Sequence, residues 1–84
     1  MKWFVYILLC NDSTLYTGIT TDLARRISQH NEGKGAKYTS MRRPIKLVYF
    51  IDKPDRSSAS KEEYRIKQLT RLQKLNLIKE FQFS

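Results

Sequence analysis

The chain lacks most of the residues on which small secreted or metal-stabilised proteins depend. It has one cysteine, one histidine, three glycines and two prolines among 84 residues. A single cysteine forms no disulfide within the chain, and one cysteine with one histidine makes no zinc site. The lone thiol, Cys10, lies in an apolar run, and this use of cysteine is typical of the reducing cytoplasm, where we expect the protein.

Long apolar runs and acidic residues are also scarce. No stretch reaches the ~18 apolar residues that a membrane-spanning helix needs. The N-terminal apolar run is short and lacks the cleavage site of a secretion signal. Eight acidic residues against sixteen Lys and Arg give a net charge of +8. This excess favours a polyanionic partner, nucleic acid ahead of a membrane surface.

The remaining pattern predicts one small α+β domain over residues 1–84. Strands are predicted over Trp3–Cys10, Leu15–Thr20 and Lys46–Asp52. Helices are predicted from a cap at Thr21 to about Asn31, from Ser57 or Ser58 to about Leu69, and from a cap at Thr70 to about Lys79. The order ββαβαα indicates a small three-stranded antiparallel sheet flanked by helices.

Apolar spacing predicts which side of each helix faces the sheet. Leu23 and Ile27 stand four residues apart on the first helix, and Gly33 supplies its stop. On the later helices, the inward stripes are predicted to be Ala59, Ile66 and Leu69, then Leu72, Leu75 and Ile78. Residues 32–44 show no hydrophobic period and are predicted to be a basic loop.

Two tyrosines occupy the two arms of the predicted hairpin. A three-residue loop, Asn11–Ser13, would pair Tyr6 with Gly18 and place Tyr6 and Tyr16 on one face. A four-residue loop would place the tyrosines on opposite faces. The sequence leaves both loops open. Gly18 would leave a gap in the sheet surface facing Tyr6.

The first helix carries a polar pair on one face. Arg26 and His30 are four residues apart and lie one turn from each other, whereas Arg25 points about 100° away, more toward solvent. A solvated polar stripe is one interpretation of this pair. A site shared with the two tyrosines is the other.

A carboxylate near these groups could bind Mg²⁺, which prefers oxygen ligands. Glu62 and Glu63 both lie near the inward stripe of the second long helix. The segment Ser60–Glu63 also fits a capping box, and Glu63 with Lys67 fits an i,i+4 ion pair. The spacing does not choose between these interpretations.

The loop after the first helix is the predicted contact surface for nucleic acid. Its cations would bind phosphates and its tyrosine would stack on a base. The predicted nucleic-acid-binding residues are Arg25, Lys34, Lys37, Tyr38, Arg42 and Arg43, with Lys46 beside them.

Together these residues resemble the GIY-YIG nuclease superfamily, and most closely its small stand-alone bacterial members. Phe4-Val5-Tyr6 resembles the Gly-Ile-Tyr half-motif, with Phe4 in place of the glycine. Tyr16-Thr17-Gly18 resembles the Tyr-Ile-Gly half-motif, with Thr17 in place of the isoleucine. The family arginine falls on Arg26 and the histidine of several members on His30. The closest match to the family glutamate is Glu63.

The resemblance implies a metal-dependent endonuclease that hydrolyses phosphodiester bonds, in DNA rather than RNA, with repair or recombination as its expected role. A single divalent ion, Mg²⁺ or Mn²⁺, would bind Glu63. Tyr16 or Tyr6 would deprotonate water with His30 as a relay, and Arg26 would stabilise the phosphate. The general base and the oligomeric state stay open, with a monomer as the working expectation.

Two other functions remain as alternatives. One is a nucleic-acid-binding module of the same fold with weak or no catalysis. The other is a protein-interaction domain that uses Phe81 and Phe83 near the C-terminus.

Overall fold

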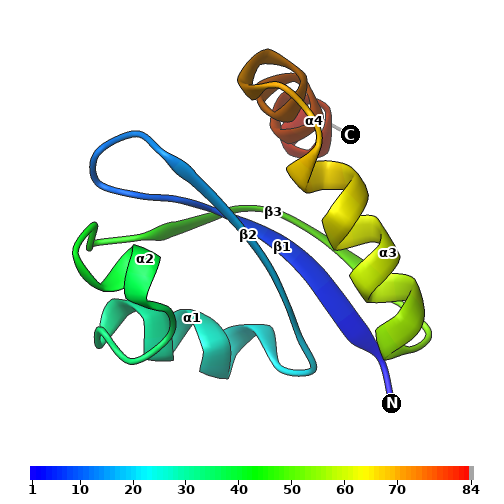
Figure 1. The fold of residues 1–84 in the computed structure, drawn as a ribbon, viewed down its shortest axis with the longest axis horizontal. Helices are drawn as coiled ribbons and strands as arrows, with labels where there is room; N and C mark the ends of the chain where they lie inside the picture. Colours follow the sequence, from blue (N-terminus) through cyan, green and yellow to red (C-terminus); the bar gives the residue numbers. More distant parts are fainter. Residues whose placement is uncertain (84) are drawn as a thin grey trace.

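Three strands form one antiparallel sheet in the computed structural model, which describes residues 1–83 and the side chains of residues 1–82. β1 (Trp3–Leu9) lies between β2 (Leu15–Thr20) and β3 (Lys46–Lys53). The helices are α1 (Leu23–Asn31), α2 (Lys37–Ser40), α3 (Arg56–Lys67) and α4 (Arg71–Phe83). The predicted α+β class and the order ββαβαα are confirmed, with α2 as an additional short helix (Figure 1).

The hairpin between β1 and β2 adopts the shorter of the two loops that the sequence left open. Cys10 N–H donates to the Thr14 carbonyl at 2.9 Å, which closes a loop over residues 11–13. Ser13 has a φ of 68°, as the last residue of a three-residue hairpin loop does. Tyr6 therefore pairs with Gly18.

The sheet has a core on each face. On one face, Val5 and Ile7 pack with the buried Ala59 and Ile66 of α3 and Ile78 of α4. The other face carries Tyr6, Leu8, Cys10 and Ile45, covered by Leu23 and Ile27 of α1 as predicted. Figure 1 shows α1 with α2 and α3 with α4 on different sides of the strands. The Cys10 thiol is free and buried.

The first helix begins one residue later than predicted. Asp22, not Thr21, is the N-cap, and its carboxylate accepts from Arg25 N–H at 3.1 Å. A carboxylate at this place satisfies a free N–H and also complements the positive end of the helix dipole. The helix ends at Asn31 as expected, and Gly33 follows with a φ of 81°.

The prediction of a basic loop over residues 32–44 is wrong for Lys37–Ser40, which form α2. No side chain caps this four-residue helix. Two arginines after it bind its carbonyls instead: Arg42 donates to Tyr38 O at 2.8 Å and Arg43 to Ser40 O at 2.9 Å. Both contacts are local, but a helix of four residues is too short to show a hydrophobic period in the sequence.

The later helices also depart from their predicted ends. α3 begins at Arg56, ahead of Ser57 and Ser58, because Asp55 is its cap and accepts from Ser58 N–H at 2.8 Å. The capping box proposed at Ser60–Glu63 is therefore wrong. The cap at Thr70 is confirmed by its reciprocal bonds with Gln73, at 2.8 and 3.2 Å.

The inward stripe predicted for α4 is only partly right. Ile78 is buried, but Leu72 is 69% exposed and Leu75 is 39% exposed. Leu77 and Phe81 join the core in their place. Phe81 packs against the rings of Tyr49 and Phe50, with centroids 5.4 and 5.2 Å apart.

Two further expectations concern the surface. Phe81 is half-buried and packed on β3, whereas the expectation of an exposed Phe83 lies outside the described side chains. Within residues 1–83, none of the helices combines the length and apolarity that crossing a membrane demands.

Replacing Ile66 with alanine should destabilise the chain far more than replacing Leu72. Ile66 is fully buried between α3 and the sheet. We expect Ile66→Ala to lower the free energy of unfolding by about 2–5 kcal/mol. Leu72→Ala is the matched control and should change it by no more than ~0.5 kcal/mol. Urea titration of both variants measures the difference, and equal losses would contradict this assignment of the core.

Candidate active site

Three of the site residues predicted from the sequence meet on the α1 side of the sheet. Tyr6 comes from β1, Tyr16 from β2 and His30 from α1. The Tyr6 hydroxyl lies 3.0 Å from His30 Nε2, and the His30 ring lies 5.3 Å from the Tyr16 ring, between centroids. Tyr6 and His30 are buried, whereas Tyr16 is partly exposed. The shared face that the three-residue loop required is thus observed.

Thr39 of α2 determines where the protons lie in the hydrogen-bonded series Tyr6–His30–Thr39. Its hydroxyl donates to the Ala36 carbonyl at 3.0 Å, and a hydroxyl has only one proton to donate. The Thr39 oxygen must therefore accept from His30 Nδ1–H, 2.7 Å away. His30 Nε2 is then free of a proton and accepts the Tyr6 O–H.

Burial keeps both titratable side chains of this hydrogen-bonded series, Tyr6 and His30, neutral. Removal from water, with the nearby charge of Arg26 as the second cause, lowers the pKa of His30 to about 4. Burial also raises the pKa of the Tyr6 phenol above its ordinary value. Arg26 opposes that rise, and Tyr16 and Glu63 add to it. At neutral pH the pair is a phenol that donates to a neutral imidazole.

Two glycines make room for these side chains. A Cβ at Gly18 would lie 2.5 Å from the Tyr6 hydroxyl oxygen, so that hydroxyl lies directly over the backbone of β2. A Cβ at Gly35 would clash with the His30 ring. Since β2 is an outer strand, Gly18 brings the Tyr6 hydroxyl from the central strand toward the edge of the sheet.

Arg26 lies beside Tyr6 and His30 and is held by two hydrogen bonds. It donates to Gln29 Oε1 and to the Gly35 carbonyl, both at 3.2 Å. Its charge is close enough to influence the pKa of Tyr6 and of His30. The bonds orient the guanidinium without neutralising it, because neither partner is an anion. Arg26 is therefore available to an anionic ligand.

The two adjacent glutamates of α3 have different surroundings. Glu62 forms ion pairs with Arg65, at 2.5 Å, and with Lys53, at 4.0 Å. These cations, the Arg65 hydrogen bond first, hold the Glu62 pKa below its ordinary value. Within residues 1–83, Glu63 forms an ion pair with Lys67 alone, at 3.3 Å, and its charge helps to raise the pKa of Tyr6. The structure thus separates two carboxylates that periodicity left equivalent.

The donor set suits one hydrated Mg²⁺ better than a closed metal cage. Within residues 1–83, no group of three His, Cys, Asp or Glu side chains could hold a metal ion. Among the described residues, Glu63 offers a carboxylate near Tyr6, and its ion-pair partner Lys67 lies at the surface. Mg²⁺ commonly binds through one or two carboxylates and keeps several waters. The residues present therefore fit a single divalent ion on Glu63.

The basic loop residues predicted to contact nucleic acid fall into two groups. Lys34 and Lys37 are exposed. Arg42 instead pairs with Asp12 at 2.9 Å and lies over the Tyr38 ring, 4.0 Å from its centroid. Arg43 donates to carbonyls within the loop. The two arginines thus hold the loop together.

Tyr38 is less available for stacking than the sequence suggested. Its ring is 5.8 Å from that of Tyr16, between centroids, in a stacked arrangement, and Arg42 lies over it. A base that stacked on Tyr38 would compete with these contacts.

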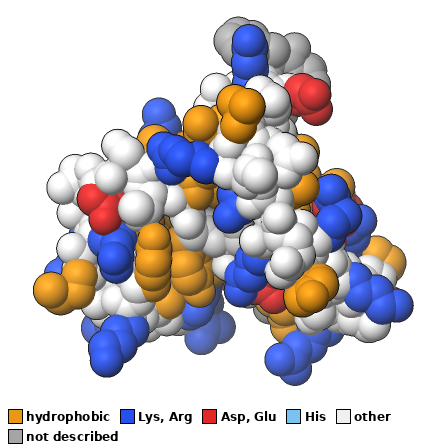
Figure 2. Space-filling view, turned by 45° about the horizontal axis from the view of Figure 1, so that its top comes forward, with side chains coloured by type: hydrophobic (Ala, Val, Ile, Leu, Met, Phe, Trp, Pro, Cys, Tyr) orange, Lys and Arg blue, Asp and Glu red, His pale blue; other side chains and the backbone are white. Residues whose placement is uncertain are grey.

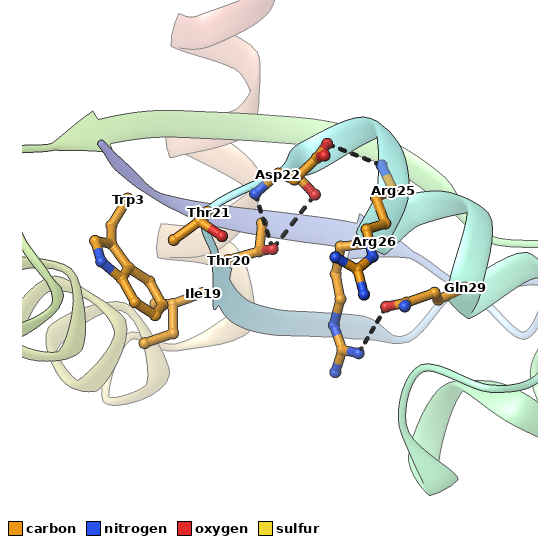
Figure 3. A pocket seen from close by; sticks show the side chains of 8 residues that line it. All are labelled: Trp3, Ile19, Thr20, Thr21, Asp22, Arg25, Arg26 and Gln29. Carbon is orange, nitrogen blue, oxygen red and sulfur yellow. Dashed lines mark hydrogen bonds between the residues drawn. The ribbon is translucent and has the colours of Figure 1, made fainter. Parts of the chain in front are cut away.

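Arg25 lies closer to the site than the sequence suggested. It is exposed, as expected, but it lines the same pocket as Arg26, beside Gln29 (Figure 3). Its backbone N–H binds the Asp22 carboxylate. Its guanidinium makes no hydrogen bond or ion pair within the part of the chain that the structure describes.

Thr39 and Gly35 belong to the site, although the sequence pattern did not predict them. Thr39 is fully buried and bonds His30 from nine residues away, across a turn. Gly35 is held against the imidazole by the same turn. No periodic spacing links these residues to His30, so the hydrophobic pattern carried no signal for them.

A family model and curated relatives match most of the chain. The GIY-YIG catalytic domain family matches residues 2–76. A UPF0213 protein of Desulfotalea psychrophila is 60% identical over 78 residues, which cover 92% of this chain and 71% of the relative. A UPF0213 protein of Staphylococcus epidermidis is 54% identical over 79 residues, which cover 94% of this chain and 96% of the relative.

Two structures solved by solution NMR resemble the chain as well. A UPF0213 protein of Bacillus halodurans is 47% identical with a TM-score of 0.61, over 94% of this chain and 84% of that one. A protein of E. faecalis is 38% identical with a TM-score of 0.66, over 100% of this chain and 90% of that one. The chain therefore belongs to the GIY-YIG catalytic domain family, among the small bacterial UPF0213 proteins.

Proposed function

We propose that this chain is an endonuclease that hydrolyses phosphodiester bonds in DNA with one divalent ion, Mg²⁺ or Mn²⁺. The observation that carries the proposal is the hydrogen bond from the Tyr6 hydroxyl to the neutral His30, beside the oriented charge of Arg26. A phosphate bound by Arg26 would bring an attacking water near a proton acceptor. These are the groups that general-base hydrolysis requires.

Tyr6, rather than Tyr16, is the proposed proton-accepting tyrosine. Tyr6 donates its hydroxyl proton to His30 Nε2, so its oxygen can accept a proton from water as its own proton moves to the imidazole. In this arrangement Tyr6 does not need to become a free phenolate, a state that its raised pKa disfavours. Tyr16 packs against the His30 ring and shields it from bulk water.

Substrate binding would make His30 a better proton acceptor. In the free protein, the charge of Arg26 contributes to the low pKa of His30. A phosphate bound to Arg26 would offset that charge and raise the pKa of the imidazole. Proton transfer to His30 would then be favoured only when a phosphodiester is in place. Arg26 would also stabilise the negative charge that develops on the phosphate.

Glu63 is the residue that would hold the divalent ion. The ion would supply positive charge that polarises the phosphate and stabilises the leaving oxygen. The distribution of cations is consistent with a DNA substrate, since Figure 2 shows Lys and Arg side chains spread over the face in view, with few acidic ones. Such a field attracts a polyanion without selecting its sequence.

Glu63→Gln should abolish most of the activity, and Glu62→Gln is its matched control. The two carboxylates are neighbours on α3, but the Glu62 carboxylate is engaged by Arg65 and Lys53. We expect Glu63→Gln to lower the cleavage rate by about 10²–10³-fold, the effect of losing one charge-stabilising group. Glu62→Gln should leave the rate close to that of the parent.

The measurement is the initial rate on flap, nicked and linear DNA with Mg²⁺ or Mn²⁺. Thermal unfolding of both variants should accompany it, because loss of the Glu62 ion pairs can weaken the fold. Equal rates for Glu63→Gln and the parent would contradict the proposed mechanism. Binding of all substrates without cleavage of any would favour the alternative of a binding module.

The neutral state of His30 predicts a specific pH dependence of stability. Its pKa is about 4 in the folded chain, against an ordinary value of 6.5. Between these pH values the unfolded chain binds a proton that the folded chain does not. The free energy of unfolding should therefore fall by up to ~3 kcal/mol as the pH drops through this window, and stay level above it.

His30→Gln removes this contribution and is the comparison to make by urea titration at several pH values. The carboxylates of Asp12 and Asp55, whose pKa values hydrogen bonds lower, affect both proteins alike. The chain has one histidine, so its ring proton can also be followed directly by NMR. A His30 that titrates near pH 6.5 would overturn the assignment of a neutral imidazole.

A further inference from the structure

Arg26 lines a pocket of about 270 Å³, and the other residues of this lining have no role in the proposed hydrolysis. It opens beside the end of β2 and the start of α1, and Figure 3 shows it from close by. Its lining residues are Trp3, Ile19, Thr20, Thr21, Asp22, Arg25, Arg26 and Gln29. The volume is near the lower end of the range of small-molecule sites, ~300–1,000 Å³, and is suited to one nucleotide unit.

The two ends of the pocket differ in chemistry. Trp3 and Ile19 form an apolar wall at one end, where the Arg56 guanidinium lies 5.7 Å from the centroid of the Trp3 ring, and the guanidinium groups of Arg25 and Arg26 lie at the other (Figure 3). A ligand that matches both ends must carry an apolar or aromatic part and a negative charge. A nucleoside with its phosphate has this composition.

Charge places the anion at the arginine end. Arg26 has only neutral partners, and Arg25 has none for its guanidinium within residues 1–83. Asp22 is the one acidic residue of the lining, and it is engaged with Arg25 N–H as the helix cap. Since this carboxylate occupies the end of α1, a phosphate would bind through the arginine side chains and not through the helix N-terminus.

We propose that this pocket holds the nucleotide next to the scissile phosphate, with the adjacent phosphate on Arg25 and the nucleoside against Trp3 and Ile19. The inference rests on the proposed function for the position of the scissile phosphate at Arg26. It assigns Arg25 a direct contact with the strand, and it makes Trp3 part of the substrate site. The contact is with backbone and ring surface, so it carries no base preference.

Trp3 offers a direct measurement because it is the only tryptophan in the chain. Trithymidylate is titrated into the parent protein in EDTA, so that no divalent ion supports cleavage, and Trp3 emission is recorded. Thymidine and inorganic phosphate are titrated separately at the same concentrations. We expect trithymidylate to change the emission and to bind at least about tenfold more tightly than either fragment, because it engages both ends of the pocket.

Arg25→Gln and Arg71→Gln form the matched pair of variants. Arg71 is also exposed and makes no side-chain hydrogen bond or ion pair in the described part of the chain, but it lines a different pocket, with Thr14, Leu15 and Lys74. Arg25→Gln should weaken trithymidylate binding by about tenfold, the loss of one charged hydrogen-bonding contact. It should also lower the slope of log affinity against log salt by about 0.7. Arg71→Gln should leave both quantities unchanged.

Two results would overturn the inference. If phosphate alone changes Trp3 emission with the affinity of trithymidylate, the pocket binds a bare anion and no nucleoside. If trithymidylate binds, as judged by anisotropy of a labelled strand, while Trp3 emission is constant and both variants weaken binding equally, the strand lies elsewhere. Neither result bears on cleavage, which the Glu63→Gln comparison tests separately.

Discussion

The hydrogen bond between Tyr6 and His30 links the central strand to α1, and Thr39 extends the link to α2. All three side chains are almost completely buried, so each polar atom must have its partner. The last hydrogen bond of this series runs from the Thr39 hydroxyl to the Ala36 carbonyl, so no polar group of the series is left unsatisfied. Loss of one member would leave the others unpaired in a small core, where such a defect is costly. Folding and the candidate chemistry therefore depend on the same contacts.

The hairpin register decides whether this link can form at all. Side chains alternate between faces, so one additional loop residue would have moved Tyr16 to the α3 side and removed Gly18 from its place opposite Tyr6. The Tyr6 hydroxyl occupies the space that a side chain at position 18 would fill. A loop far from the site thus sets its geometry.

The sequence predicted those features that follow from the period of a helix or a strand. It placed Arg26 and His30 on one face of α1, and it described the two possible hairpin registers. It did not choose between Glu62 and Glu63, because the difference lies in Lys53 and Arg65, and Lys53 comes from another element. Thr39 was missed because its contact with His30 is tertiary, and α2 was missed because a helix of four residues is too short to show a hydrophobic period. Helix starts were misplaced by one or two residues, because aspartates compete with neighbouring threonine and serine as caps.

The same distinction applies to the arginines, which the sequence presents as one basic surface. Arg42, Arg43 and Arg65 use their guanidinium groups within the fold. An arginine engaged in this way contributes to long-range attraction of a polyanion, since its charge remains partly exposed, but it has fewer donors left for a phosphate. Arg25 keeps its guanidinium donors within residues 1–83, and Arg26, which donates to Gln29 and to the Gly35 carbonyl, has no anionic partner there. The net charge of +8 therefore sets the long-range attraction of a nucleic acid, whereas the guanidinium donors that remain free would set the position at which it binds.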